Sequence, residues 1–174
     1  MKPPYHKGQS LLEVMIALTM LTVGFLGIAS LLAQSFFLGR AISNEAVATY
    51  LASEGIEIAK NLIDHDVYAH LASMGPGWNF CFGAGGDFQL DYATVNCSNL
   101  PLYDSANHLN LDPATHRYSY QETIGSAATV FTRDVRVTVP NVNEIVVNAI
   151  VRWSTGPLAS QSINLEDRFY NWHP

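Results

Sequence analysis

The sequence of 174 residues predicts an α+β protein in which one long N-terminal helix packs on an antiparallel sheet of about four strands. Three observations predict this fold class. No charged residue occurs between Val14 and Gly39. Residues 40–65 continue with apolar side chains at helical spacing. Segments after residue 117 alternate between apolar and polar side chains and are separated by short turns.

The apolar segment is longer than the ~18 residues at which a membrane span becomes the default reading. Lys2 and Lys7 precede it, and positive charge beside a span holds that end in the cytoplasm. A cleaved secretory signal would have a much shorter apolar core. A plain signal anchor fits the length but leaves Glu13, at the head of the segment, without the partner that a charge near a membrane helix usually has.

Residues 40–65 place apolar side chains on one helical face and polar ones on the other. The apolar face consists of Val47, Ala48, Leu51, Ala52, Gly55, Ile58, Ala59 and Leu62. We therefore expect one continuous helix from Gln9 to near Asp64, about 55 residues or ~80 Å long. Because Gly55 lies on the apolar face, the sheet is expected to approach the helix closely there.

Residues 66–117 are rich in turn-forming residues and contain the only two cysteines, Cys81 and Cys97. The even count predicts one disulfide in an oxidising compartment, and two free thiols are the alternative. Such a disulfide closes a loop of about 15 residues and stabilises the fold by roughly 3 kcal/mol in the chain-entropy model.

Four segments of the C-terminal part are predicted strands. They are residues 118–123, 130–139, 144–153 and 160–169. Short connections between consecutive strands predict an antiparallel meander. Arg133 interrupts the apolar side of the second strand, which predicts weaker burial there, whereas Trp153 is expected in the core.

The net charge of −6 argues against nucleic-acid binding, which usually shows a basic patch. Asp66 and His70 are a possible metal pair, but a solvated helix end is the favoured interpretation. Loop oxygens suggest calcium or, more simply, Asx turns; the candidate ligands are Asp104, Asn107, Asn110 and Asp112. No GxSxG motif accompanies the loop histidines, so neither catalytic residues nor a cofactor is expected.

Residues Lys7 to Leu18, KGQSLLEVMIAL, resemble the class III signal of type IV pilins and type II secretion pseudopilins. The resemblance implies a type IV pilin-like fold and cleavage by a prepilin peptidase between Gly8 and Gln9. It also implies N-methylation of Gln9 and an assembly role for Glu13, the glutamate at the fifth mature position. Gln9 departs from the phenylalanine of most major pilins. Residues 50–64, YLASEGIEIAKNLID, more loosely resemble the second helical half of PilV-type proteins.

The expected organisation has five parts: a leader at 1–8, a transmembrane and assembly half-helix at 9–39, an amphipathic half-helix at 40–65, a variable loop region with a disulfide at 66–117, and the sheet with its tail at 118–174. The resemblance implies a non-enzymatic minor pilin or pseudopilin. Its implied partners are other pilin subunits, prepilin peptidase, an inner-membrane assembly platform and membrane lipid. The implied location is the cytoplasmic membrane and then an extracytoplasmic filament. The alternative is a membrane-anchored extracytoplasmic binding domain that does not polymerise.

Overall fold

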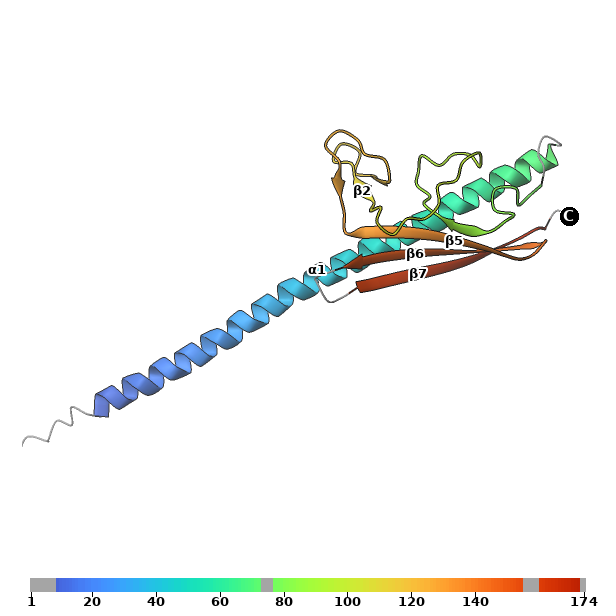
Figure 1. The fold of residues 1–174 in the computed structure, drawn as a ribbon. Helices are drawn as coiled ribbons and strands as arrows, with labels where there is room; N and C mark the ends of the chain where they lie inside the picture. The colour runs from blue at the N-terminus through green and yellow to red at the C-terminus, as the bar shows by residue number, and fades with distance from the viewer. Residues whose placement is uncertain (1–8, 73–76, 155–159, 173–174) are drawn as a thin grey trace, which may run out of the picture. The chain divides into compact units, whose positions relative to one another are not determined.

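The computed structural model describes residues 9–72, 77–154 and 160–172. The chain divides into two compact units, Met1–Ser43 and Asn44–Pro174. A single helix, α1 (Gln9–Leu71), contributes to both units (Figure 1). The second unit also contains every strand that the structure describes.

Helix α1 has 63 residues and continues beyond the predicted end near Asp64. Its last turn is followed by a backbone hydrogen bond from Ala72 N to Tyr68 O of 3.0 Å. The predicted apolar face of its second half is confirmed, because Ala48, Leu51, Ala52, Ile58, Ala59 and Leu62 are all buried. The polar side chains on the other face, including Ser53, Glu57 and Lys60, are exposed.

Four antiparallel strands form the main sheet, in the order β1-β5-β6-β7. They are β1 (Gly86–Phe88), β5 (Phe131–Asn141), β6 (Glu144–Ser154) and β7 (Ser160–Tyr170). The predicted fold class, a long helix packed on an antiparallel four-stranded sheet, is therefore confirmed. The last three predicted strands are also present, joined as neighbours in the sheet.

The first predicted strand is wrong in extent and in place. Only Tyr118–Ser119 of residues 118–123 form a strand, β3, and it belongs to a second sheet. That sheet has the order β3-β2-β4, with β2 at Asn110–Leu111 and β4 at Ala127–Ala128. The fourth strand of the main sheet is β1, which comes from the region predicted to be irregular and pairs with Val135–Val137 of β5.

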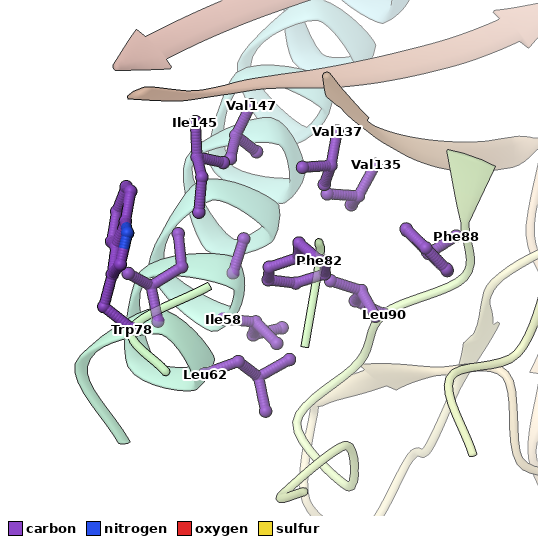
Figure 2. Close-up of a cluster of buried hydrophobic side chains, with 12 residues drawn as sticks. Ile58, Leu62, Trp78, Phe82, Phe88, Leu90, Val135, Val137, Ile145 and Val147 are labelled. Atoms are coloured by element: carbon purple, nitrogen blue, oxygen red, sulfur yellow. The ribbon is translucent and has the colours of Figure 1, made fainter. Parts of the chain in front are cut away.

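The core of the second unit lies between the helix and the inner face of the main sheet. One cluster joins Ile58 and Leu62 of α1 to aromatic side chains of residues 77–88 and to valines of β5 and β6 (Figure 2). A second cluster lies around Leu51, Phe131 and Trp153, which confirms the predicted core position of Trp153. Both clusters contain side chains of α1, so the helix packs against the two of them.

Gly55 lies where the sheet approaches the helix closely, as predicted. A Cβ atom at this position would lie 3.1 Å from Arg133 Cδ, 3.2 Å from Ala149 Cβ and 3.3 Å from Val135 Cγ2. These separations are shorter than ordinary van der Waals contacts between carbon atoms. The absence of a side chain at Gly55 therefore allows β5 and β6 to pack directly against the helix backbone.

Candidate assembly segment and disulfide site

The first half of α1 exposes apolar side chains in every direction. From Leu11 to Leu38, all residues are exposed in the structure, and they include large side chains such as Met20 and Phe25, each 72% exposed. The helix is long and apolar enough to cross a membrane, judged by length and composition alone, with a mean hydropathy of 2.2 in its apolar window. A contiguous apolar surface of this size marks a site of membrane or protein contact.

The threonine hydroxyls in this segment are bonded within the helix. Thr19 Oγ1 donates to Ile16 O at 2.8 Å, and Thr22 Oγ1 donates to Thr19 O at 2.9 Å. Such internal bonds satisfy polar groups that an apolar medium would leave unpaired. The two threonines therefore leave the segment compatible with lipid or with an apolar helix bundle.

Glu13 lies in the part of α1 nearest its N-terminus, and it is exposed. It follows Gln9, the first residue of the helix, by four positions, which is about one helical turn. Gly8, the residue before the predicted cut, lies outside the described residues.

Cys81 and Cys97 are joined by a disulfide, as predicted, with Cα atoms 4.9 Å apart. Both cysteines are half-buried. They lie in the segment that follows α1 and that contributes Trp78 and Phe82 to the core. The disulfide therefore closes a loop that packs against the end of the helix.

Asp66 of α1 lies directly beside this disulfide, and the predicted solvated position is wrong. The residue is only 5% exposed. Its Oδ2 accepts a hydrogen bond from Cys81 N at 2.7 Å, and its Oδ1 is 3.7 Å from Cys97 Sγ. Burial raises the pKa of the Asp66 carboxyl above its ordinary value, although the Cys81 N–H and the nearby His65 act in the opposite direction. The proposed pairing with His70 cannot be followed, since the side chain of His70 is outside the described part.

Arg133 is the second residue whose predicted environment is wrong: its side chain is completely buried. Nη1 donates to Leu51 O at 2.9 Å and to Glu54 Oε2 at 2.8 Å, and Nη2 donates to Leu90 O. Because these acceptors belong to the helix and to the chain after β1, the guanidinium joins both to β5. These acceptors satisfy both terminal nitrogens, which makes the burial of the charge tolerable, although Nε has no hydrogen-bond partner in the described part of the structure.

A further polar group is buried on the same strand. Asp134 is 1% exposed, and its Oδ2 lies 3.4 Å from Nη2 of Arg136 and from Nη1 of Arg152. Burial is the main cause that raises the pKa of Asp134. Arg152 also donates to the Tyr103 hydroxyl at 3.2 Å, so the loop that carries Tyr103 helps to cover this face. Thr132, Arg133 and Asp134 are all buried, so this part of β5 is covered on both faces.

Of the four loop residues considered as calcium ligands, the two aspartates make local hydrogen bonds. Asp104 Oδ1 accepts from Ala106 N at 2.9 Å, and Asp112 Oδ1 accepts from Ala114 N at 2.8 Å. These are Asx turns, the simpler of the two interpretations. Asn107 donates to Gln89 Oε1 at 3.0 Å, and Asn110 is buried in β2. In the described ranges, the group of His, Cys, Asp or Glu close enough for a metal is Asp66 with Cys81 and Cys97, whose sulfur atoms are in the disulfide.

Residues 4–29 match the family model described as the prokaryotic N-terminal methylation motif. The matched range contains the predicted cleavage position and Glu13. No curated protein and no solved structure matches the chain. The helix and sheet form a pilin-like α+β arrangement. The motif indicates a type IV pilin-like prepilin that is processed by a peptidase, a structural and not an enzymatic class of protein.

Proposed function

We propose that this chain is a minor pilin or pseudopilin, a structural subunit of a type IV pilus or a type II secretion-like filament. The observation that carries the proposal is the combination of the methylation motif at residues 4–29 with an apolar half-helix that is exposed on all sides. A helix that is apolar all round is stable only when lipid or other protein covers it. The membrane supplies that cover before assembly, and neighbouring subunits supply it afterwards.

Glu13 has a specific role in this proposal. Cleavage between Gly8 and Gln9 creates a positively charged α-amine at Gln9, about one helical turn from the Glu13 carboxylate. In the filament, Glu13 of one subunit pairs with the amine of a neighbour, so that neither charge is left alone in an apolar environment. The prepilin peptidase that makes this cut also methylates the new amine of Gln9, as it does in the family that the motif defines.

The partners follow from this role. They are other pilin or pseudopilin subunits, the prepilin peptidase, an inner-membrane assembly platform and membrane lipid. The precursor lies in the cytoplasmic membrane with residues 1–8 in the cytoplasm, where Lys2 and Lys7 hold that end. The unit from Asn44 onward lies on the other side and becomes part of the filament surface.

The first test is the position of cleavage. The full chain is expressed with and without a prepilin peptidase, and the mature N-terminus is determined by mass spectrometry. We expect Gln9 as the N-terminal residue only when the peptidase is present, and a mass gain of one methyl group on it. If Gln9 never becomes the N-terminus, the subunit proposal fails and the anchored, non-polymerising binding domain takes its place.

The second test separates assembly from processing. Glu13→Ala is expected to be cleaved normally but to be recovered in sheared filaments at no more than about one tenth of the wild-type level, because an unpaired charge costs several kcal/mol in an apolar environment. The matched control is Glu45→Ala, which removes an exposed carboxylate from the same helix outside the apolar segment. Normal incorporation of the Glu13 variant would remove the charge-pairing argument.

A further inference from the structure

The two carboxylate oxygens of Asp66 contact different cysteines of the disulfide. Its Oδ2 is held by the N–H of Cys81 at 2.7 Å, which leaves Oδ1 directed at the sulfur of Cys97, 3.7 Å away. The three ligand-type atoms of Asp66, Cys81 and Cys97 lie within 4.8 Å of one another. A buried acid has thus been placed against one sulfur of a disulfide, in a position from which a proton can pass between them.

We propose that Asp66 is the proton acceptor for closure of the Cys81–Cys97 disulfide and the proton donor for its opening. This inference concerns maturation of the globular unit, goes beyond the filament role and does not depend on it. Asp66 exchanges a proton with the Cys97 sulfur, and it affects the bond between the two sulfur atoms only through that exchange.

The reaction balances with a disulfide oxidant. In the first exchange, the Cys81 thiolate attacks the oxidant, its sulfur–sulfur bond breaks, a mixed disulfide forms, and one half of the oxidant leaves as a thiolate that takes a proton from water. In the second, the Cys97 sulfur attacks Cys81 Sγ, the bond between Cys81 and the oxidant breaks as the Cys81–Cys97 bond forms, and the second half of the oxidant leaves as a thiolate that is also protonated by water. The proton of the Cys97 thiol passes to Asp66 Oδ1 as the sulfur becomes nucleophilic, since only the thiolate attacks. Opening by a dithiol reductant reverses these steps, and Asp66 returns the proton to the Cys97 thiolate as it leaves.

The other groups around Asp66 are consistent with this role. The N–H groups of Phe80 and Cys81, from the loop, and His65, from the helix, stabilise its ionised form, whereas burial opposes it. The balance raises the pKa of Asp66, which makes the carboxylate a stronger base than an exposed aspartate. Asp64, on the same turn, is exposed. Cys81 Sγ lies near Leu62 O at 3.9 Å, a group that accepts but does not titrate.

The position of Asp66 also links oxidation to folding. Asp66 belongs to α1, while both cysteines belong to the segment after the helix. The two parts meet through the core contacts of Trp78 and Phe82 with Leu62 and neighbouring side chains (Figure 2). The base therefore reaches Cys97 only when the loop has packed on the helix, so closure is fastest in the correctly folded chain.

The test uses the full chain in detergent micelles, reduced with a phosphine and then mixed with one equivalent of 4,4′-dithiodipyridine. Each exchange releases one 4-thiopyridone, whose absorbance separates the two steps. We expect Asp66→Asn to slow the second step at least about tenfold at neutral pH, in line with the loss of a general base. In Asp66→Asn the mixed disulfide is expected to accumulate, and peptide mass spectrometry should find its pyridyl group on Cys81. The amide of the variant still accepts the Cys81 N–H, which preserves the local hydrogen bond.

Electrostatics alone predict the opposite result. Removal of a negative charge beside a thiol favours its thiolate and would speed closure. Asp64→Asn is the matched control, because it removes the same charge from an exposed site on the same helix, and we expect its rate to stay within about twofold of the wild type. As the pH falls from 7 to 4, the wild-type advantage over Asp66→Asn is expected to shrink, because Asp66 becomes protonated.

Asp66→Glu distinguishes a base from a structural support, and we expect it to recover most of the wild-type rate. Equal slowing of Asp66→Asn and Asp66→Glu would show a structural role and overturn the proposal. An unchanged or faster second step in Asp66→Asn would overturn it as well. A pyridyl group trapped on Cys97 would overturn the assignment of Cys97 as the attacking sulfur.

Discussion

The two halves of α1 are both α-helical, but the character of their surfaces differs. From Leu11 to Leu38, the helix is exposed on every side and carries one charge, Glu13. From Asn44 onward, it buries a stripe of small and aliphatic side chains and exposes polar ones. Helical structure alone therefore says little about what a helix does. The difference lies in the width of the apolar surface, which is a stripe where one sheet covers it and a full circumference where lipid or several helices must cover it.

The largest expected effect concerns the contacts that only the second half makes. Arg133→Ala removes three hydrogen bonds to the helix and to the chain after β1, and it leaves Leu51 O and Leu90 O without their buried donor. We expect a loss of about 3–5 kcal/mol in the free energy of unfolding. Urea titration in micelles measures it, because the fluorescence of the buried Trp78 and Trp153 reports on this unit.

Arg168→Ala is the control for Arg133. Arg168 forms ion pairs with Glu144 and Glu166, but its side chain is 52% exposed. We expect a change below about 1 kcal/mol, as for other exposed ion pairs. Equal losses in the two variants would contradict the role given to Arg133 as a buried connection between helix and sheet.

A smaller effect compares glycines in the two halves. Gly55→Val is expected to destabilise the second unit by about 1–3 kcal/mol, because Arg133, Ala149 and Val135 leave no room for a side chain. Gly24→Val has nothing within 4 Å of its new Cβ, so the unfolding midpoint of the second unit should not change. Thermal unfolding followed by circular dichroism and fluorescence measures both. A stable Gly55 variant would show that the helix and sheet can separate without cost.

The smallest expected effect is a pH dependence within the second unit. Burial raises the pKa of Asp134 in the folded state, so folding favours its protonated form. The stabilisation is fully present below the unfolded pKa, near 4, and is lost as the pH rises through the folded pKa. Asp134→Asn should therefore flatten this part of the stability profile between pH 4 and 7 in urea titrations. Asp167→Asn, at an exposed site on β7, controls for net charge. A profile as steep in Asp134→Asn as in the wild type would assign the dependence to another group.

The sequence predicts well where a pattern is long. The amphipathic stripe from Val47 to Leu62 and the alternation in β6 repeat over many residues, so period and burial agree there. In β5 the alternation locates the strand but not its burial, because residues 131–135 are buried on both faces. β1 has only three residues beside a run of glycines, which is too short for a period to appear. Its pairing depends on the long strand β5, not on a local preference.

Arg133 and Asp66 were predicted in the wrong environment for a different reason. Charged side chains are usually exposed, and local sequence gives no sign of the exception. The acceptors of Arg133 lie 82 and 43 residues away, at Leu51 and Leu90, and the donor to Asp66 lies 15 residues away at Cys81. The disulfide was easier to predict, since a chain with two cysteines allows only one intramolecular pairing.

The threonine bonds in the apolar half have a consequence for alignment. Between Leu11 and Ala29, the side chains able to form hydrogen bonds are those of Glu13, Thr19 and Thr22, and both threonines are already bonded to their own helix. Apolar contacts are not directional, so a neighbouring helix that slides or rotates along this stretch exchanges one set of contacts for an equivalent set. If Glu13 pairs with a neighbouring subunit as proposed, this one carboxylate fixes the register between such helices at one end, while the apolar remainder stays free to adjust.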